Sequence, residues 1–261
     1  MKPSELFDVS GRSALVTGAS GALGAVAART LAGAGCRLTL TAGTADALEA
    51  VAGECRELGA EVVTVNARPE TEATADAMVE KAVEEHGRLD ILVVASGINR
   101  VGMIEEMAPD AFADVMDANV TQSWLLARAA TRQMKAQGDG GKIVLVSSTR
   151  GILGHPAGYT AYCASKAAVD GITKALACEL GPTGITVNAV GPTVFRSVLT
   201  DWMFTDAPKA VKTRDNIVSR IPKGRLGEPE DLAGPLLFLA SSASDFYTGH
   251  ILYADGGYTA G

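Results

Sequence analysis

The chain has 261 residues, of which 47% are hydrophobic and 20% charged, so it is long enough to bury one full hydrophobic core. Its formal net charge of -7 makes the surface acidic and excludes nucleic acid as an expected partner, because phosphate backbones bind basic surfaces. No apolar stretch follows Lys2 and no later segment approaches about 18 consecutive apolar residues, so we expect no signal peptide, no membrane span and a cytoplasmic location.

Short apolar, β-branched runs alternate along the chain with longer Ala-rich segments of helical period. This alternation is typical of βαβ units, in which helices cover both faces of a parallel sheet. It predicts an α/β fold with a doubly wound seven-stranded parallel sheet in a single domain, residues 1–261. The predicted strands are 13–17, 37–41, 61–66, 91–95, 142–147, 186–190 and 251–254. The predicted helices are 22–34, 45–58, 71–86, 109–137, 159–181 and 229–240.

One irregular region follows the sixth predicted strand and mixes Trp202, Met203 and Phe204 with many charges. A connection of this length is unusual in a compact domain unless it has a function of its own. We therefore predict a substrate lid at about 193–226.

The first strand leads into TGASGALG, residues 17–24, and a predicted helix follows at once. Glycines in this context let the backbone turn tightly and approach a pyrophosphate, which the free N–H groups at a helix N-terminus stabilise. A plain tight turn is the alternative, but the strand before and the helix after favour a phosphate loop.

Nucleotide choice in such folds is usually set at the end of the second strand, where a carboxylate binds the ribose and repels a 2′-phosphate. Here that place is occupied by residues 41–44, TAGT, with neither an acid nor an arginine. Arg37 lies at the far end of the strand, and Asp46 is explained as well by a helix N-terminus. We expect NADP or NAD, with NADP favoured.

Tyr162 and Lys166 are four residues apart, so on a helix they share one face. A phenol with a pKa of about 10 is a poor base, but an adjacent ammonium and a positive nicotinamide ring stabilise the phenolate. Although this spacing is common by chance, its position after the fifth strand favours a proton-transfer site. Tyr159 is the competing tyrosine, but Cys163 follows it at the same spacing and carries no ammonium.

The fifth strand ends in Ser147, Ser148 and Thr149, at the edge where open α/β sheets bind ligands. A hydroxyl there can hydrogen-bond a substrate carbonyl, or it can simply end the strand. Asn119 lies inside the predicted helix 109–137, where its low propensity indicates a surface position or a kink.

In sequence order, TGASGALG, GRLDILV, Asn119, GKIVLVSS, YCASK, ITVNAVGP, GRLGEPEDLA and TGHILYADGG together resemble the short-chain dehydrogenase/reductase family, from about Gly11 to Gly257. The resemblance implies a Rossmann-type subunit, usually in a homotetramer, that oxidises or reduces CH–OH groups with NAD(P). It implies that Tyr162 is the acid/base, that Lys166 binds the nicotinamide ribose and lowers the tyrosine pKa, and that Ser148 orients the carbonyl. Asn119 would hold a water that links Lys166 to solvent.

The cofactor-binding residues implied by the resemblance are Gly18, Ser20, Gly21, Leu23, Gly24, Asn66, Ala67, Ala95, Gly97, Tyr162, Lys166, Pro192 and Ser197. Some positions depart from the family pattern. Ala22 replaces a glycine of the phosphate loop, VASG at 94–97 replaces NNAG, and Asn66 replaces an aspartate that meets the adenine. The interval from Ser148 to Tyr162 is one residue longer than usual, so strict counting would select Thr149; the offset of Gly151 favours Ser148.

The segment GINRVGMIEEM, residues 97–107, resembles the corresponding part of gluconate 5-dehydrogenase and related sugar-acid dehydrogenases. It would place Arg100 beside the pocket, with Arg150 after the catalytic serine and Arg196 at the start of the lid. Arginine suits a carboxylate because its fork donates two parallel hydrogen bonds. The substrate hypothesis is therefore a sugar acid or polyol, unless these arginines are solvated surface charges.

Two alternatives remain open. Aromatic lid residues would suit an apolar substrate, which makes a 3-oxoacyl or general ketone reductase the second interpretation. A non-catalytic nucleotide-binding protein is the third, although the complete set of candidate catalytic residues argues against it. The four cysteines lack CxxC spacing and the three histidines are scattered, so we expect reduced thiols and no metal site.

Overall fold

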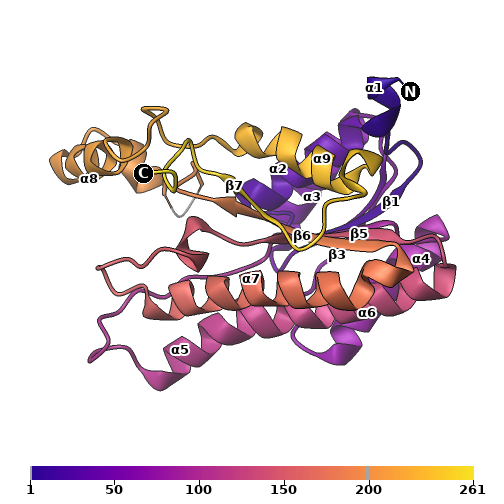
Figure 1. Cartoon of the computed structure of the whole chain (residues 1–261), viewed down its shortest axis with the longest axis horizontal. Helices are drawn as coiled ribbons and strands as arrows, with labels where there is room; N and C mark the ends of the chain where they lie inside the picture. Colours follow the sequence, from indigo (N-terminus) through magenta and orange to yellow (C-terminus); the bar gives the residue numbers. More distant parts are fainter. Residues whose placement is uncertain (1, 198–199) are drawn as a thin grey trace.

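The structure, a computed structural model, describes residues 2–197 and 200–261 and shows them as a single domain. Seven parallel strands form one sheet in the order β3-β2-β1-β4-β5-β6-β7 (Figure 1). The predicted doubly wound, seven-stranded sheet is confirmed. The strands are β1 (Ser13–Thr17), β2 (Arg37–Thr41), β3 (Val62–Val65), β4 (Ile91–Val94), β5 (Gly141–Val146), β6 (Ile185–Pro192) and β7 (Ile251–Ala254).

Helices cover both faces of this sheet. The α-helices are α1 (Pro3–Leu6), α2 (Ala22–Gly33), α3 (Ala45–Glu57), α4 (Glu72–His86), α5 (Pro109–Met116), α6 (Gln122–Gln137), α7 (Thr160–Leu180), α8 (Pro208–Val218) and α9 (Ala233–Ala240). Helices α2, α3 and α9 pack on one face, while α4, α6 and α7 pack on the other (Figure 1). Within the described ranges, no helix is both long and apolar enough to cross a membrane.

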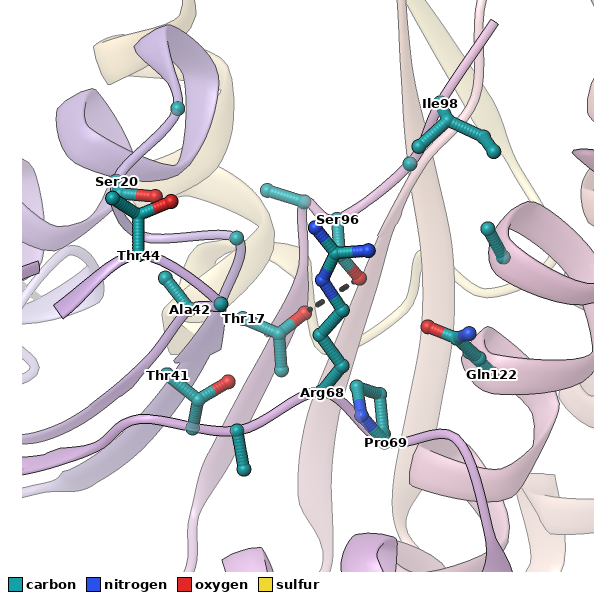
Figure 2. A pocket seen from close by; sticks show the side chains of 17 residues that line it. Thr17, Ser20, Thr41, Ala42, Thr44, Arg68, Pro69, Ser96, Ile98 and Gln122 are labelled. Carbon is teal, nitrogen blue, oxygen red and sulfur yellow. Dashed lines mark hydrogen bonds between the residues drawn. The ribbon is translucent and has the colours of Figure 1, made fainter. Parts of the chain in front are cut away.

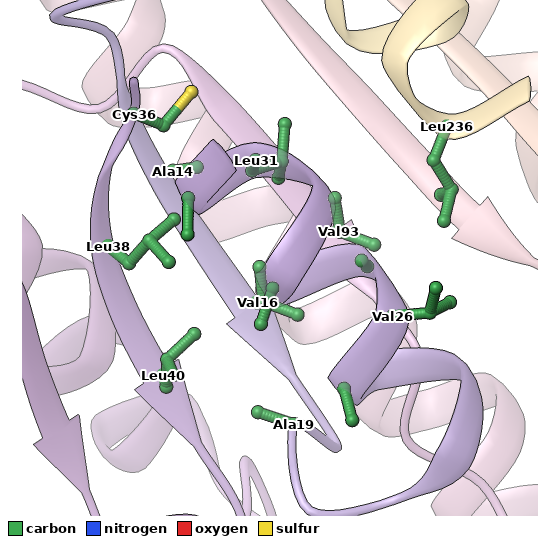
Figure 3. Packing of buried hydrophobic residues seen from close by; sticks show 14 of the residues in the cluster. Ala14, Val16, Ala19, Val26, Leu31, Cys36, Leu38, Leu40, Val93 and Leu236 are labelled. Carbon is green, nitrogen blue, oxygen red and sulfur yellow. The ribbon is translucent and has the colours of Figure 1, made fainter. Parts of the chain in front are cut away.

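The central strand β1 shows why the sheet is buried on both sides. Its side chains alternate, so Ala14 and Val16 join the core beneath α2 while Leu15 joins the opposite core (Figure 3). All three side chains are fully buried. A strand that is apolar on both faces needs helices on both faces, and parallel pairing brings the carboxyl ends of neighbouring strands to one edge. Thr17, at the end of β1, lies beside Thr41 of β2 and Val94 of β4.

The predicted helix 109–137 is wrong as a single α-helix. It is interrupted by a π-helical turn, η1 (Asp117–Thr121), in which the backbone N–H of Gln122 bonds to the carbonyl oxygen of Asp117. Asn119 lies inside this turn and is only 1% exposed, so the low helix propensity marks a buried irregularity and not a surface position. Such π turns are frequent at functional sites.

The predicted lid contains secondary structure that the sequence pattern did not indicate. It holds the short helix η4 (Asp201–Phe204) and the helix α8, while residues 198 and 199 lie outside the described residues. Its buried side chains Ile221 and Leu226 form a small separate core with Tyr258 near the C-terminus. The lid therefore packs on the C-terminal segment, beside which α8 projects from the end of the molecule (Figure 1).

Candidate active site

A pocket of about 200 Å³, open to solvent, lies at the carboxyl ends of β1, β2, β3 and β4 (Figure 2). It sits where the strand order reverses, since β1 pairs with both β2 and β4. Open α/β sheets bind ligands in the crevice outside this point. The walls consist mainly of small side chains and backbone, which leaves room for a large ligand.

The turn after β1 is so compact that only glycine fits at two of its positions. Gly18 has a φ of +64°, and a Cβ there would lie 2.7 Å from the backbone nitrogen of Ser96. A Cβ on Gly24 would collide with the carbonyl oxygen of Gly18. Gly21 is the N-cap of α2 and lines the pocket together with Ser20. The N-terminus of α2 thus opens into the pocket, where its dipole stabilises a phosphate.

Other predicted cofactor residues divide into two groups. Those that also line the pocket are Ala67, Ala95 and Gly97. Leu23 packs instead against the core beneath α2. The side chain of Asn66 donates from Nδ2 to the carbonyl oxygen of Ala42 at 2.8 Å, so it joins the ends of β3 and β2. The predicted adenine contact of Asn66 would have to use its remaining amide oxygen.

Arg68, which the sequence interpretation missed, follows β3 and lines the same pocket. A Cβ on Gly43 would lie 2.6 Å from its Nε, so the glycine after β2 lets the arginine cross the end of that strand. Figure 2 shows the side chain reaching from this loop toward the middle of the pocket. Among the described residues, the pocket lining holds no carboxylate to pair with Arg68. The sequence signal that could have identified Arg68 is its position as a basic residue directly after the predicted site residue Ala67.

Tyr162 and Lys166 lie one turn apart on α7, with Lys166 Nζ 5.5 Å from the centre of the Tyr162 ring. Lys166 is buried and donates from Nζ to the carbonyl oxygen of Val146 at 2.8 Å. Burial lowers the pKa of Lys166 to about 8, against an opposing effect of Asp170. Burial raises the pKa of Tyr162, while a hydrogen bond with Ser148 lowers it. Burial thus favours the neutral form of both side chains and outweighs the pKa lowering that the spacing predicts for Tyr162.

The structure distinguishes the two candidate hydroxyls after β5. Ser148 is the one whose hydrogen bond acts on Tyr162. Its Oγ also accepts from the backbone N–H of Arg150 at 3.2 Å and lies 3.4 Å from the carbonyl oxygen of Pro192, the last residue of β6. Thr149, at 1% exposed, begins the short helix η2 (Thr149–Gly151). The geometry therefore favours Ser148.

Asn119 links the loop after β4 to helix α7. Its Oδ1 accepts from the backbone N–H of Ile98 at 2.7 Å, and its Nδ2 donates to the carbonyl oxygen of Ile98 and to Ser165 Oγ, both at 2.9 Å. A Cβ on Gly97 would lie 2.9 Å from Asn119 Oδ1 and 3.7 Å from Lys166 Nζ. The side chain of Asn119 thus fixes the position of the loop that passes Lys166.

Comparisons with known proteins agree with this geometry. The family model described as Enoyl-(Acyl carrier protein) reductase matches residues 18–259. The chain belongs to the short-chain dehydrogenase/reductase family. An uncharacterized oxidoreductase of Mycobacterium tuberculosis is 54% identical over 97% of this chain and 93% of its own. A 3-oxoacyl-[acyl-carrier-protein] reductase of Rickettsia bellii is 36% identical over 97% of this chain and 98% of its own.

Among solved structures, a gluconate 5-dehydrogenase from Burkholderia cenocepacia in complex with NADP and tartrate superposes with a TM-score of 0.91. It is 31% identical, and the match covers 98% of each chain. This chain is therefore an oxidoreductase of the family, and the predicted resemblance is confirmed.

In this dehydrogenase/reductase, the three predicted substrate arginines have different surroundings. Arg196 pairs with Glu228 at 3.0 Å and is 47% exposed. Arg100 lies 3.9 Å from Asp114 and is 57% exposed. Arg150 instead lies two residues after Ser148, and its guanidinium bonds only neutral oxygens among the described residues. Arg150 is the one of the three that bonds Ser148, through its backbone N–H at 3.2 Å.

The remaining predicted cofactor residue, Ser197, lies on the lid. Its backbone N–H donates to Thr200 Oγ1 at 2.9 Å, and the two hydroxyl oxygens are 3.1 Å apart. The aromatic lid residues also have separate environments, since Trp202 is 45% exposed while Phe204 packs against the lid core. The lid thus presents both polar and apolar groups near the site.

Proposed function

We propose that this oxidoreductase interconverts a secondary alcohol and a ketone with NADP or NAD, using Tyr162 as acid/base. The observation that carries the proposal is the convergence of Tyr162 and Lys166 of α7 with Ser148, from the turn after β5, beside the loop of Gly97, which also lines the pocket. A proton-transfer group thus adjoins a pocket whose glycine-rich turn and helix N-terminus suit a dinucleotide.

The pocket residues fit a dinucleotide. Gly18 and Gly24 leave no room for a side chain where the backbone must approach a pyrophosphate, and the N-terminus of α2 favours its negative charge. Lys166 would bind the nicotinamide ribose, and Ser197 the carboxamide. A bound nicotinamide supplies or accepts the hydride.

Within this arrangement, Tyr162 exchanges a proton with the substrate oxygen while Ser148 donates a hydrogen bond to that oxygen. Lys166 supplies the charge that stabilises the phenolate, since a pKa of about 8 leaves it largely protonated at neutral pH. Asn119 holds the loop of Ile98 in place, and its π turn is the proposed position of a water that links Lys166 to solvent. The proton then has a route between the site and bulk water.

We further propose that the protein prefers NADP to NAD and that Arg68 determines this preference. A 2′-phosphate near the end of β2 would meet the guanidinium that crosses Gly43, with no acidic side chain in the described pocket lining to repel it. NAD lacks this phosphate and would gain nothing from Arg68. The arginine therefore replaces the basic residue that the sequence of β2 itself lacks.

For the substrate we propose a sugar acid or polyol, with a 3-oxoacyl compound or another ketone as the second candidate. The Burkholderia neighbour supports the first reading and the Rickettsia relative the second. Arg150 beside Ser148 favours an anionic substrate, whereas the exposed ring of Trp202 favours an apolar one. Assays of sugar acids against acyl and apolar ketones, with both cofactors, separate the two readings.

We also propose a cytoplasmic homotetramer that binds no nucleic acid. The net charge of -7 supports the last point. Phe112 on α5 and Trp124 on α6 are 38% and 44% exposed, which suits a contact between copies along these helices. Light scattering that finds a monomer would remove the tetramer from the proposal.

The decisive experiment is Tyr162→Phe, measured for turnover and for dinucleotide binding. We expect kcat to fall by about 10²–10⁴-fold while the dinucleotide dissociation constant stays within a factor of three of wild type. Ser148→Ala should lower kcat by about 10²-fold, whereas Thr149→Val should leave it nearly unchanged. Full turnover in Tyr162→Phe would refute the assignment, and a larger loss in Thr149→Val than in Ser148→Ala would transfer the carbonyl contact to Thr149.

A further inference from the structure

Two arginines from different segments converge on the ring of Tyr258. Arg150 comes from the turn after β5, and Arg220 comes from the end of the lid after α8. Their Cζ atoms lie 5.6 Å and 4.8 Å from the centre of the ring. Arg150 also donates from Nη2 to the Tyr258 hydroxyl at 3.2 Å and from Nη1 to the carbonyl oxygen of Gly154 at 2.7 Å. Because Tyr258 is only 5% exposed, it is a fixed platform for both guanidinium groups.

These two positive charges lack the carboxylate partners that Arg196 and Arg225 of the lid have. Arg196 and Arg225 each pair with a carboxylate, at 3.0 Å and 2.6 Å. Neither Arg150 nor Arg220 forms an ion pair with any residue in 2–197 or 200–261. An anion within reach of both guanidinium groups would therefore be stabilised by two positive charges.

The arginine pair adjoins the proposed carbonyl-binding hydroxyl, because the backbone N–H of Arg150 donates to Ser148 Oγ at 3.2 Å. The rings of His155 and Tyr159 lie 4.3 Å apart, and those of Tyr159 and Tyr162 lie 6.2 Å apart. A row of aromatic side chains thus leads from the loop that follows Arg150 to Tyr162. Burial and then the charges of Arg150 and Arg220 lower the pKa of His155. The charge of Arg150 also acts on Tyr162, whose pKa it lowers against the larger effect of burial. An anion at the pair would therefore lie close to the group that exchanges the proton.

We propose that Arg150 and Arg220, with the hydroxyl of Tyr258, form a carboxylate-binding site that selects hydroxy acids or keto acids as substrates. This inference rests on the proposed function and identifies its substrate class. Arg150 donates one hydrogen bond to the hydroxyl oxygen of Tyr258. This hydroxyl keeps its own proton, which it can donate to a ligand. Two guanidinium groups and one hydroxyl then surround the carboxylate.

A free carboxylate fits better than the phosphate of an acyl carrier. In a carrier-bound 3-oxoacyl group, the long pantetheine arm separates the phosphate from the reacting carbonyl. Arg150 instead bonds Ser148 Oγ through its backbone N–H at 3.2 Å, so an anion held at this residue lies within the length of a short molecule from the reacting carbon. The site is thus matched to a short acid and not to a carrier.

The test compares acids with neutral analogues of the same shape. The probes are D-gluconate with D-glucitol and 3-hydroxybutanoate with 3-hydroxybutanamide, titrated calorimetrically into the protein with saturating NADP⁺ and again without it. We expect at least one acid to bind at least tenfold more tightly than its analogue, and Arg150→Gln with Arg220→Gln to remove this difference. Arg225→Gln is the matched control on the same lid and should keep it.

Several outcomes would overturn the site. They are equal binding of each acid and its analogue, no binding of either acid, or an unchanged preference in the double variant. Should the double variant fail to fold, Arg220→Gln alone, at an exposed position, should still reduce the preference at least threefold. If the protein binds no dinucleotide but still prefers acids, the proposed function is refuted and the carboxylate site is supported. If it oxidises alcohols with no preference for acids, the proposed function is supported and the carboxylate site is refuted.

Discussion

The proposed active site has two ends, which differ in the groups that form them. The end beneath the glycine-rich turn consists of backbone and small side chains, at the carboxyl ends of four neighbouring strands. The other end consists of long polar side chains that meet from β5, the lid and the C-terminal segment, as Arg150, Arg220 and Tyr258 do. Parallel pairing alone positions the first end, whereas the second depends on how three distant segments pack.

This contrast separates what the family shares from what distinguishes this chain. A nucleotide can be held by backbone that any member of the fold provides, so its site depends on where glycine is required. The substrate must be chosen by side chains, so its site depends on charge and shape. Substitutions at the first end should therefore disturb folding and cofactor binding together, while those at the second should change selectivity alone.

The strongest expected effect lies at the glycine-rich end. Gly18→Ala places a Cβ 2.7 Å from the backbone nitrogen of Ser96, at a φ that already disfavours alanine. We expect the free energy of unfolding to fall by about 2–4 kcal/mol and dinucleotide binding to weaken. Gly11→Ala is the control, since Gly11 has a similar φ of +72° but no atom within 4 Å of its Cβ position. Urea unfolding of both variants measures the difference, and equal losses would contradict a steric role for Gly18.

Sequence patterns predicted the glycine-rich end well because its causes are local. Strands β1, β2 and β7 have the predicted bounds, and Gly18, Ser20 and Gly21 line the pocket. The low helix propensity of Asn119 indicated a kink as one of two possibilities, but hydrophobic period cannot distinguish a π turn from an α-helical turn. The side chain of Asn119 bonds a loop 21 residues earlier in the chain.

The side chains that cross between elements were missed for a related reason. Arg68 belongs to the pocket because Gly43, in the turn after β2, leaves space for it. Arg220 belongs beside Arg150 because the lid packs on Tyr258. Neither relation has a signature in the spacing of residues along the chain, since tertiary packing creates both.

The second expected effect concerns the pH dependence of stability. The pKa of Lys166 is about 8 in the folded protein and 10.5 when unperturbed, so between these values the unfolded chain binds more protons than the folded one. Stability due to this group therefore rises with pH through the window and is lowest below pH 8, where the buried ammonium is protonated. The difference in unfolding free energy between wild type and Lys166→Met should rise by up to about 3 kcal/mol from pH 8 to 10.5. Lys174→Met, on the exposed side of α7, should show no such rise; a flat difference for Lys166→Met would contradict the lowered pKa.

The smallest effect tests whether side chains also make choices at the nucleotide end. Arg68→Gln removes a cation from a pocket whose described lining has no carboxylate, so it should weaken 2′,5′-ADP binding by about tenfold and leave 5′-AMP binding unchanged. Equal weakening of both ligands would mean that Arg68 stacks on the adenine and reads no phosphate. Arg29→Gln, which removes an equal charge from the ion pair with Glu54, controls for net charge. A selective loss would show that this end, although built from backbone, also depends for its specificity on one side chain from a neighbouring strand.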